Sequence, residues 1–238
     1  MNAAHPAKPL PVYLQIAELL ARQIKAGYWH SGERLPTEAE LAQTLSVAVG
    51  TLRKSLALLE DQGVLERIQG SGTYVRQVQG KQQIYELFRL ELADGPGLPT
   101  AQIVDLSLEP SPVPLSDSTG AGRLCWRVRR WRFLSQVPVA LEEIWFSAAA
   151  CPDLTVQELG DSMYLFYQQR LGVWISRVED QISAAPTPDW SCQPVALKPG
   201  ACSGYIERVS WSKENQIVEF SRTWFDPAVC RYSSRMSQ

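Results

Sequence analysis

Three helices followed by a glycine-tipped hairpin, all within residues 11–76, constrain the fold of this chain more than any other feature. Apolar side chains recur at helical spacing and form a first buried stripe of Ile16, Leu19, Leu20 and Ile24. Thr37 and Glu40 have the spacing of a capping box, which predicts the start of a second helix. The core side of a third helix consists of Leu52, Leu56 and Leu59. Two short strands, 64–68 and 73–76, then flank a glycine-rich turn.

This order of elements is typical of a winged helix-turn-helix. In that fold the third helix enters the major groove of DNA, and the hairpin touches the neighbouring backbone or minor groove. Charge supports the interpretation only weakly, because residues 1–76 hold 8 Lys+Arg against 7 Asp+Glu, whereas a nucleic-acid-binding domain is expected to be basic. The pattern of elements therefore predicts a winged helix-turn-helix DNA-binding domain at residues 1–76.

Length and composition leave room for a second domain and exclude several classes of protein. The chain has 238 residues, of which 45% are hydrophobic and 20% charged, and a net charge of −2, which is typical of one large or two ordinary globular domains. Its five cysteines include no Cys-x-x-Cys pair, which argues against a metal site or a disulfide framework and favours a cytoplasmic location. No apolar run is long enough to span a membrane. We expect no metal and no cofactor.

The remainder of the chain has the pattern of a sheet. Residues 77–83 are polar and predict a linker, and a second domain is expected over residues 84–238. Alternating or strongly apolar runs predict strands at 103–108, 124–133, 139–146, 174–184, 204–211 and 217–225. Helical spacing over residues 162–171 is followed by Gly172, a typical helix end. Many strands with few helices predict an antiparallel sheet covered by helices, an α+β domain.

The first domain resembles the GntR family of bacterial transcription regulators. The resemblance is carried by the runs Pro11-Val12-Tyr13-Leu14-Gln15-Ile16, Gly32-Glu33-Arg34-Leu35-Pro36-Thr37-Glu38 and Gln69-Gly70-Ser71-Gly72-Thr73-Tyr74-Val75. The chain departs from the family at the start of the third helix, where Ala48 and Val49 replace a serine and an arginine, and in the second helix, where Ala39 replaces an arginine. Alanine does not cap a helix and valine cannot bind guanine through two hydrogen bonds. We therefore expect an altered operator preference, a weaker affinity, or both.

Six residues are expected to contact DNA: Arg34, Thr51, Arg53, Lys54, Gln69 and Gly70. Thr51 and Arg53 match the family's pattern and would be the main contacts that remain on the third helix. Lys54 and Arg34 can reach phosphates, and the wing tip would approach the minor groove, where the missing side chain of Gly70 permits close contact. The alternative is that Arg53 and Lys54 only form a solvated helix face.

The C-terminal part is similar to the effector-binding UTRA domain of the HutC branch of this family. The runs that carry the similarity are Arg130-Trp131-Arg132, Val137-Pro138-Val139-Ala140-Leu141-Glu142-Glu143, Ser162-Met163-Tyr164, Leu171-Gly172-Val173 and Val218-Glu219-Phe220-Ser221. This resemblance implies a sheet related to chorismate lyase, binding of a small metabolite instead of catalysis, and a homodimer formed through the C-terminal half. The family's Asp-Arg-Tyr ending is only partly met by Cys230-Arg231-Tyr232.

Five residues are candidates for effector binding. Strand alternation places Arg130 and Arg132 on one face, where two guanidinium groups form a fork suited to phosphate or carboxylate. In members of the family that bind sugar phosphates, the positions matching these arginines and Glu142 line the pocket, and the resemblance adds Ser162 and Glu219. Two alternatives stay open. Arg130 and Glu142 would form an ordinary cross-strand ion pair, and Ser162 would only cap its helix.

Together these patterns predict a ligand-responsive transcriptional repressor that binds a pseudo-palindromic DNA operator as a homodimer. The effector is expected to be a small anionic metabolite of the sugar phosphate, carboxylate or phosphonate type. Two other functions are compatible with the sequence: a chorismate lyase-like enzyme with a helical accessory domain, and a regulator with little DNA affinity that acts through protein partners. The residues leave open the sign of regulation, and whether Ala39, Ala48 and Val49 weaken DNA binding or only change its specificity.

Overall fold

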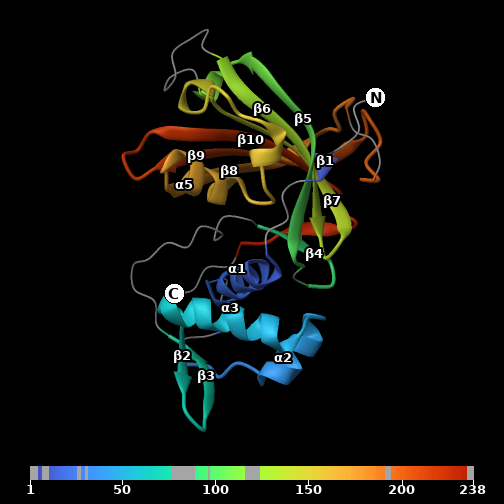
Figure 1. Cartoon of the computed structure of the whole chain (residues 1–238). Helices are drawn as coiled ribbons and strands as arrows, with labels where there is room; N and C mark the ends of the chain where they lie inside the picture. Colours follow the sequence, from blue (N-terminus) through green and yellow to red (C-terminus); the bar gives the residue numbers. More distant parts are fainter. Residues whose placement is uncertain are drawn as a thin grey trace. The chain divides into compact units, whose positions relative to one another are not determined.

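The computed structural model describes residues 5–6, 11–25, 28–29, 32–76, 89–95, 97–115, 124–190 and 194–234 (Figure 1). The chain divides into a smaller unit of residues 10–89 with 233–238, and a larger unit of residues 90–232 with 1–9. The strand β1 (His5–Pro6) belongs to the larger unit, because it pairs with β5 (Pro99–Pro110). The predicted linker 77–83 lies outside the described residues. None of the helices in the described ranges has both the length and the apolar composition needed to cross a bilayer.

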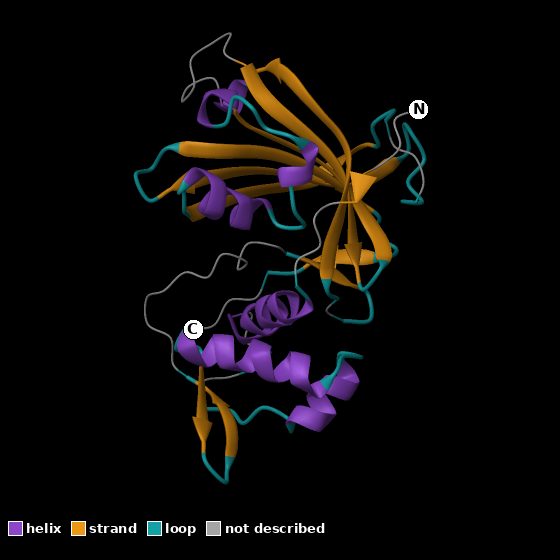
Figure 2. Cartoon of the chain, in the orientation of Figure 1, coloured by secondary structure: helices purple, strands orange, loops and turns teal. Residues whose placement is uncertain are grey.

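The described part of the smaller unit consists of three helices and a hairpin, in the order that the sequence predicts (Figure 2). The helices are α1 (Val12–Lys25), α2 (Glu38–Thr44) and α3 (Val49–Asp61). Their apolar stripes meet in a core whose fully buried members include Ile16, Leu20, Leu52 and Leu59. The predicted capping box is confirmed, because the Glu40 amide donates to Thr37 Oγ1 at 3.3 Å and the Thr37 amide donates to Glu40 Oε2 at 2.9 Å.

The hairpin of the smaller unit, called the wing below, pairs β2 (Leu65–Ile68) with β3 (Gly72–Val75). Its turn needs glycine, since Gly70 has φ 76° and Gly72 has φ 137°, where other residues are strained. Arg34, which precedes α2, forms a β-bridge to the second strand of the wing. A Cβ atom on Gly72 would lie 2.7 Å from Arg34 Nε, so glycine also makes room for this guanidinium.

The larger unit is an antiparallel sheet with few helices, as predicted. Its further strands are β4 (Leu90–Leu92), β6 (Leu124–Leu134), β7 (Val137–Ser147), β8 (Ile175–Pro186), β9 (Cys202–Ser212), β10 (Ile217–Phe225) and β11 (Cys230–Tyr232). Within the described residues, seven strands form one sheet in the order β1-β5-β6-β7-β10-β9-β8, and β4 pairs with β11 separately. The short 3-10 helices η1 (Ala148–Ala150) and η2 (Val156–Glu158) precede α5 (Met163–Leu171), which covers one face of this sheet (Figure 1).

The connection between β6 and β7 is tighter than the sequence predicts. The predicted strands 124–133 and 139–146 leave residues 134–138 between them, but β6 extends to Leu134 and β7 already begins at Val137. Ser135 and Gln136 form the turn with φ values of 47° and 68°, the positive values that a two-residue type I′ turn requires. Neither residue is glycine, so the usual sequence signal for this turn is missing.

The strand register determines which side chains share the sheet face under α5. Arg130 on β6 lies opposite Glu142 on β7, which lies opposite Thr223 on β10. Because side chains alternate between the two faces of a sheet, one face carries the charged residues Arg130, Arg132, Glu142, Asp180, Arg208 and Glu219. The other face packs Trp131 in an apolar cluster with Leu141 and Trp224. The alternation predicted for β6 is therefore confirmed.

Candidate functional site

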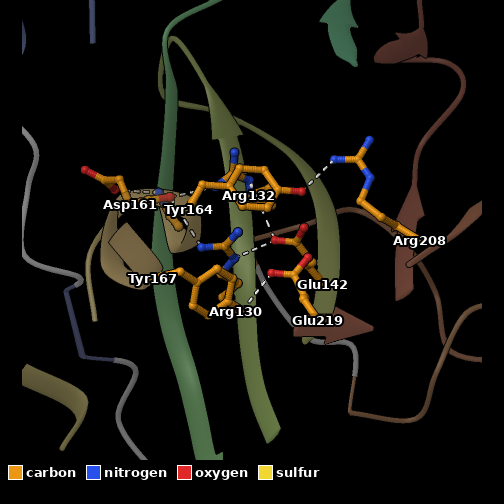
Figure 3. A network of polar contacts seen from close by, with 9 residues as sticks. Arg130, Arg132, Glu142, Asp161, Tyr164, Tyr167, Arg208 and Glu219 are labelled. Atoms are coloured by element: carbon orange, nitrogen blue, oxygen red, sulfur yellow. Dashed lines mark hydrogen bonds and ion pairs between the residues drawn. The ribbon is translucent and has the colours of Figure 1, made fainter. Parts of the chain in front are cut away.

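Arg130 and Glu142 form the centre of a buried polar network on the sheet face under α5 (Figure 3). Arg130 Nε donates to Glu142 Oε2 at 2.5 Å, and the two side chains are 6% and 13% exposed. Burial opposes both charges, but the pairing outweighs it: Glu142 raises the pKa of the Arg130 guanidinium, and Arg130 with Arg132 lowers the pKa of Glu142. Both groups are therefore charged near neutral pH.

The segment before α5 holds the two arginines of β6 side by side. The main-chain carbonyl of Asp161 accepts from Arg130 Nη1 at 3.3 Å and from Arg132 Nη1 at 2.9 Å. The Asp161 carboxylate in turn accepts from the Ala101 amide of β5 at 2.7 Å, which fixes this segment to the sheet. Figure 3 shows both guanidinium groups directed toward the start of α5. Two arginines oriented in this way present several N–H donors in one place, the arrangement that binds carboxylate or phosphate.

Glu219 adds a second carboxylate with the opposite electrostatic character. The hydroxyl of Tyr167 donates to Glu219 Oε2 at 2.7 Å, and the hydroxyl of Ser210 donates to Oε1 at 3.3 Å. Burial raises the pKa of Glu219, and the nearby negative charge of Glu142 adds to this, while the Tyr167 hydrogen bond and two arginines oppose it. The network thus pairs a strongly ionised carboxyl with one that is more easily protonated.

A third arginine, Arg208, occupies the β9 side of the same network. Its Nε and Nη2 donate to the two carboxylate oxygens of Asp180 at 2.6 and 2.7 Å, and the side chains are 12% and 8% exposed. Arg208 Nη1 donates to the Tyr164 hydroxyl at 3.2 Å, and the Tyr232 hydroxyl donates to Asp180 Oδ2 at 2.7 Å. Burial raises the pKa of Tyr164 to about 12, so this phenol stays protonated. These contacts link α5 to β8, β9 and β11.

The chemistry of this network is that of recognition. Guanidinium groups donate to anionic oxygens, carboxylates accept from hydroxyl groups, and tyrosine hydroxyls do both. Within the described part of the chain, no group of three or more histidine, cysteine, aspartate or glutamate side chains is placed to bind a metal ion. The combination of positive and negative hydrogen-bonding groups suits a small molecule that carries an acid group and several hydroxyls.

In the smaller unit, the exposed start of α3 lies beside the acidic start of α2. Arg53 Nε donates to Glu38 Oε2 at 2.5 Å, while 64% of the arginine side chain remains exposed. Ala48 is the N-cap residue of α3 and supplies no side-chain cap, as its identity predicts. Thr51 is half-buried, and its amide donates to the Ala48 carbonyl at 2.9 Å. The predicted DNA-contacting residues that lie exposed are Arg34, Arg53, Lys54, Gln69 and Gly70.

Two family models match this chain, one for each unit. Residues 12–75 match the bacterial regulatory proteins of the gntR family, and residues 97–229 match the UTRA domain. The chain belongs to the GntR family. Its UTRA domain places this GntR regulator in the HutC branch, which the sequence resemblance had indicated.

The GntR regulator is similar to named relatives over nearly its whole length. It is 42% identical over 234 residues to the HTH-type transcriptional regulator SmoD of Agrobacterium fabrum, covering 98% of this chain and 99% of that one. It is 33% identical over 224 residues to the mannosyl-D-glycerate transport/metabolism system repressor MngR of Escherichia coli, covering 91% and 92%. The solved structure of the possible transcriptional regulator YydK from Bacillus subtilis shares the fold, with a TM-score of 0.54 at 19% identity over 94% and 99% of the two chains.

These relatives are named as regulators and repressors, and the chain is accordingly a transcriptional regulator and not an enzyme. The names of these relatives therefore favour regulation over the lyase-like alternative. GntR regulators bind DNA and UTRA domains bind small-molecule effectors. The family matches therefore support the two kinds of partner expected from the sequence, DNA and a small-molecule effector.

The structure brings four of the five candidate effector residues of this GntR regulator into one network: Arg130, Arg132, Glu142 and Glu219. The fifth, Ser162, is the N-cap of α5 and accepts from the Leu165 amide at 3.3 Å. The structure contains both contacts of the simpler interpretations, because Arg130 and Glu142 form a cross-strand pair and Ser162 caps α5. Their roles toward an effector stay predictions.

Several members of the network were not among the residues that the sequence predicted. Tyr164 and Tyr167 are three residues apart on α5, and that spacing on one helix face was a usable signal. Arg208 and Asp180 face each other across β9 and β8, and they lie 28 residues apart in the sequence. Their pairing depends on the register of two strands, which alternation within each strand does not determine.

Proposed function

We propose that this GntR regulator is a cytoplasmic homodimeric repressor that binds a pseudo-palindromic operator and responds to a small anionic metabolite. In this proposal residues 1–76 form the DNA-binding domain, 77–83 a linker, and 84–238 the effector-binding and dimerisation domain. The observation that carries the proposal is the buried network in which Arg130 and Arg132 point together at the start of α5 while Glu142 and Glu219 lie beside them.

The effector would use both halves of that network. Its acid group would bind Arg130 and Arg132 and replace part of their bonding to the Asp161 carbonyl, with Ser162 at the helix start as a further donor. Its hydroxyl groups would donate to Glu142 and Glu219. One relative is named for mannosyl-D-glycerate, a glycoside that carries a carboxylate, and this class of molecule matches the required chemistry. A sugar phosphate or phosphonate would satisfy the same donors.

On DNA, two copies would place their α3 helices in successive major-groove half-sites. Thr51 and Arg53 would contact base edges, Lys54 and Arg34 the phosphates, and the wing tip at Gln69 and Gly70 the minor groove. Effector binding would favour an arrangement of the two DNA-binding domains that fits the half-site spacing less well. Coupling of this kind typically amounts to about 1–3 kcal/mol, or roughly 5- to 150-fold in operator affinity.

Selection of duplexes from a random pool, followed by titration of the enriched sequence, tests this function. We expect enrichment of a two-fold symmetric site and a salt-sensitive affinity. Addition of mannosyl-D-glycerate or of a panel of sugar phosphates should then weaken binding. If the pool yields no enriched sequence, DNA-dependent repression is contradicted.

A second function, regulation through protein partners with little DNA affinity, is favoured by one observation. The N-cap Ala48 gives α3 no side-chain bond, and Val49 cannot form the arginine contact of the family. In that case the natural chain enriches no duplex, while the double substitution Ala48→Ser with Val49→Arg creates DNA binding.

A further inference from the structure

One carboxylate in the smaller unit holds arginines from two different elements. Glu38, in the first turn of α2, accepts from Arg53 Nε of α3 through Oε2 at 2.5 Å. Its other oxygen, Oε1, accepts from Arg67 Nη2 of the wing strand β2 at 2.9 Å. The two arginine side chains are 64% and 45% exposed, whereas that of Glu38 is 26% exposed. The recognition helix and the wing are therefore joined through a single side chain.

The position of this triad, Glu38, Arg53 and Arg67, has a consequence for DNA binding. Arg53 lies on the part of α3 that would enter the major groove, and its contact with Glu38 engages Nε. Arg67 shares the same carboxylate, so its guanidinium lies next to that of Arg53 on the same surface. Two guanidinium groups around one carboxylate leave a net positive charge, which suits a phosphate beside the groove.

We infer that Arg67 contacts the DNA backbone and that Glu38 is a positioning residue which orients Arg53 and Arg67 together. This inference rests on the proposed operator binding and adds a contact that the sequence did not indicate. Arg67 of the wing then supplies a guanidinium group to the DNA interface. At the same interface, α3 has Val49 where the family has an arginine. Glu38 fixes the direction of Arg53, so that its remaining donors meet a base edge in one geometry.

A simple charge argument predicts the opposite effect for Glu38, which makes the inference testable. DNA repels a carboxylate, so if Glu38 acted only through its charge, its neutralisation would tighten binding to every duplex. If Glu38 positions the two arginines, its neutralisation weakens binding to the operator, and binding to an unrelated duplex does not fall. The amide of Glu38→Gln has one acceptor oxygen, which cannot hold both arginines as the carboxylate does.

The test uses the full-length protein, the duplex enriched from a random pool and a scrambled duplex of equal length, with fluorescence anisotropy at several salt concentrations. Arg76→Ala is the matched control, because Arg76 follows the same hairpin, is 54% exposed and pairs with Glu66 at 3.6 Å. Exposed pairs of this kind contribute little to folding, and thermal unfolding of each variant verifies this.

We expect Arg67→Ala to lower operator affinity about tenfold and to reduce the slope of log K against log salt by about 1, as loss of one phosphate contact does. Arg67→Lys, which keeps the charge, should retain most of that slope. Glu38→Gln should weaken operator binding about fivefold, with no loss on the scrambled duplex, and so lower the specificity ratio. Arg76→Ala should change operator affinity by less than about twofold.

Two outcomes overturn the inference while leaving operator binding intact: an Arg67→Ala variant that behaves like Arg76→Ala, or a Glu38→Gln variant that binds the operator as tightly as the unaltered chain. A different outcome, in which the unaltered chain enriches no duplex, overturns the proposed function together with the inference.

Discussion

Replacement of Asp180 by asparagine disrupts a buried, doubly hydrogen-bonded ion pair of the larger unit. Arg208 loses two charged contacts, at 2.6 and 2.7 Å, and both side chains are almost fully buried, at 12% and 8% exposed. Removal of one partner from a buried ion pair costs about 3–5 kcal/mol, because the other charge stays buried without compensation. Asparagine keeps one acceptor oxygen for Arg208 or Tyr232, so we expect a loss of about 3 kcal/mol, at the lower end of that range.

The assay follows thermal unfolding by tryptophan fluorescence, since every tryptophan except Trp29 lies in the larger unit. For a unit of this size, 1 kcal/mol changes Tm by about 2–4 °C, so Asp180→Asn should lower Tm by about 6–12 °C. Asp153→Asn is the matched control, because Asp153 is 79% exposed and pairs with Arg170 at 3.6 Å, a pair worth at most about 1 kcal/mol.

A double substitution, Asp180→Leu with Arg208→Met, removes both charges at once. Because no unpaired charge is left behind, this variant should recover part of the stability that Asp180→Asn loses. A burial cost for the unpaired Arg208 charge is refuted if Asp180→Asn lowers stability no more than Asp153→Asn, or if the double variant is less stable than the single one.

Three further predictions concern other positions. Ala48→Ser should stabilise the smaller unit by about 1 kcal/mol, because it adds the missing N-cap bond of α3, whereas Ala57→Ser inside the same helix should not; circular dichroism on denaturation compares them. Glu219→Gln should become more stable relative to the unaltered chain as the pH rises. Because the pKa of Glu219 is raised in the folded state, its protonation stabilises the fold below about pH 4.5, and this stabilisation is lost as the pH rises through the folded-state pKa. Equal pH profiles of stability for the two proteins would contradict this prediction. Ser162→Ala should destabilise α5 by about 1 kcal/mol and weaken effector binding, while Ser162→Asn should restore the cap but not the effector contact; equal effector affinities in both variants and the unaltered chain would show a cap alone.

The sequence carried enough local information to predict the elements that hold the site. Alternation along one strand was sufficient to place Arg130 and Arg132 on a common face, because the side-chain period of a strand is two. The capping box of Thr37 and Glu40 was likewise readable, since its two hydrogen bonds join residues three apart.

The interactions that the sequence did not predict join residues distant in the chain. Glu38 contacts Arg53 and Arg67 at separations of 15 and 29 residues, so the helical pattern around Glu38 gave no indication of either partner. The turn at Ser135 and Gln136 was not predicted from the sequence for a different reason. Positive φ is normally signalled by glycine or asparagine, and here the strong pairing of β6 with β7 imposes it on other residues.

The most direct test of effector binding under α5 is operator affinity measured with and without anionic ligands, in the unaltered chain and in Arg132→Gln. The ligands are a panel of sugar phosphates together with mannosyl-D-glycerate, and thermal unfolding establishes that the variant is folded. We predict that at least one ligand weakens operator binding of the unaltered chain by roughly 5- to 150-fold, and that Arg132→Gln binds the operator normally but loses this response. A ligand that weakens operator binding equally in both proteins would contradict the claim that the arginines under α5 hold the effector.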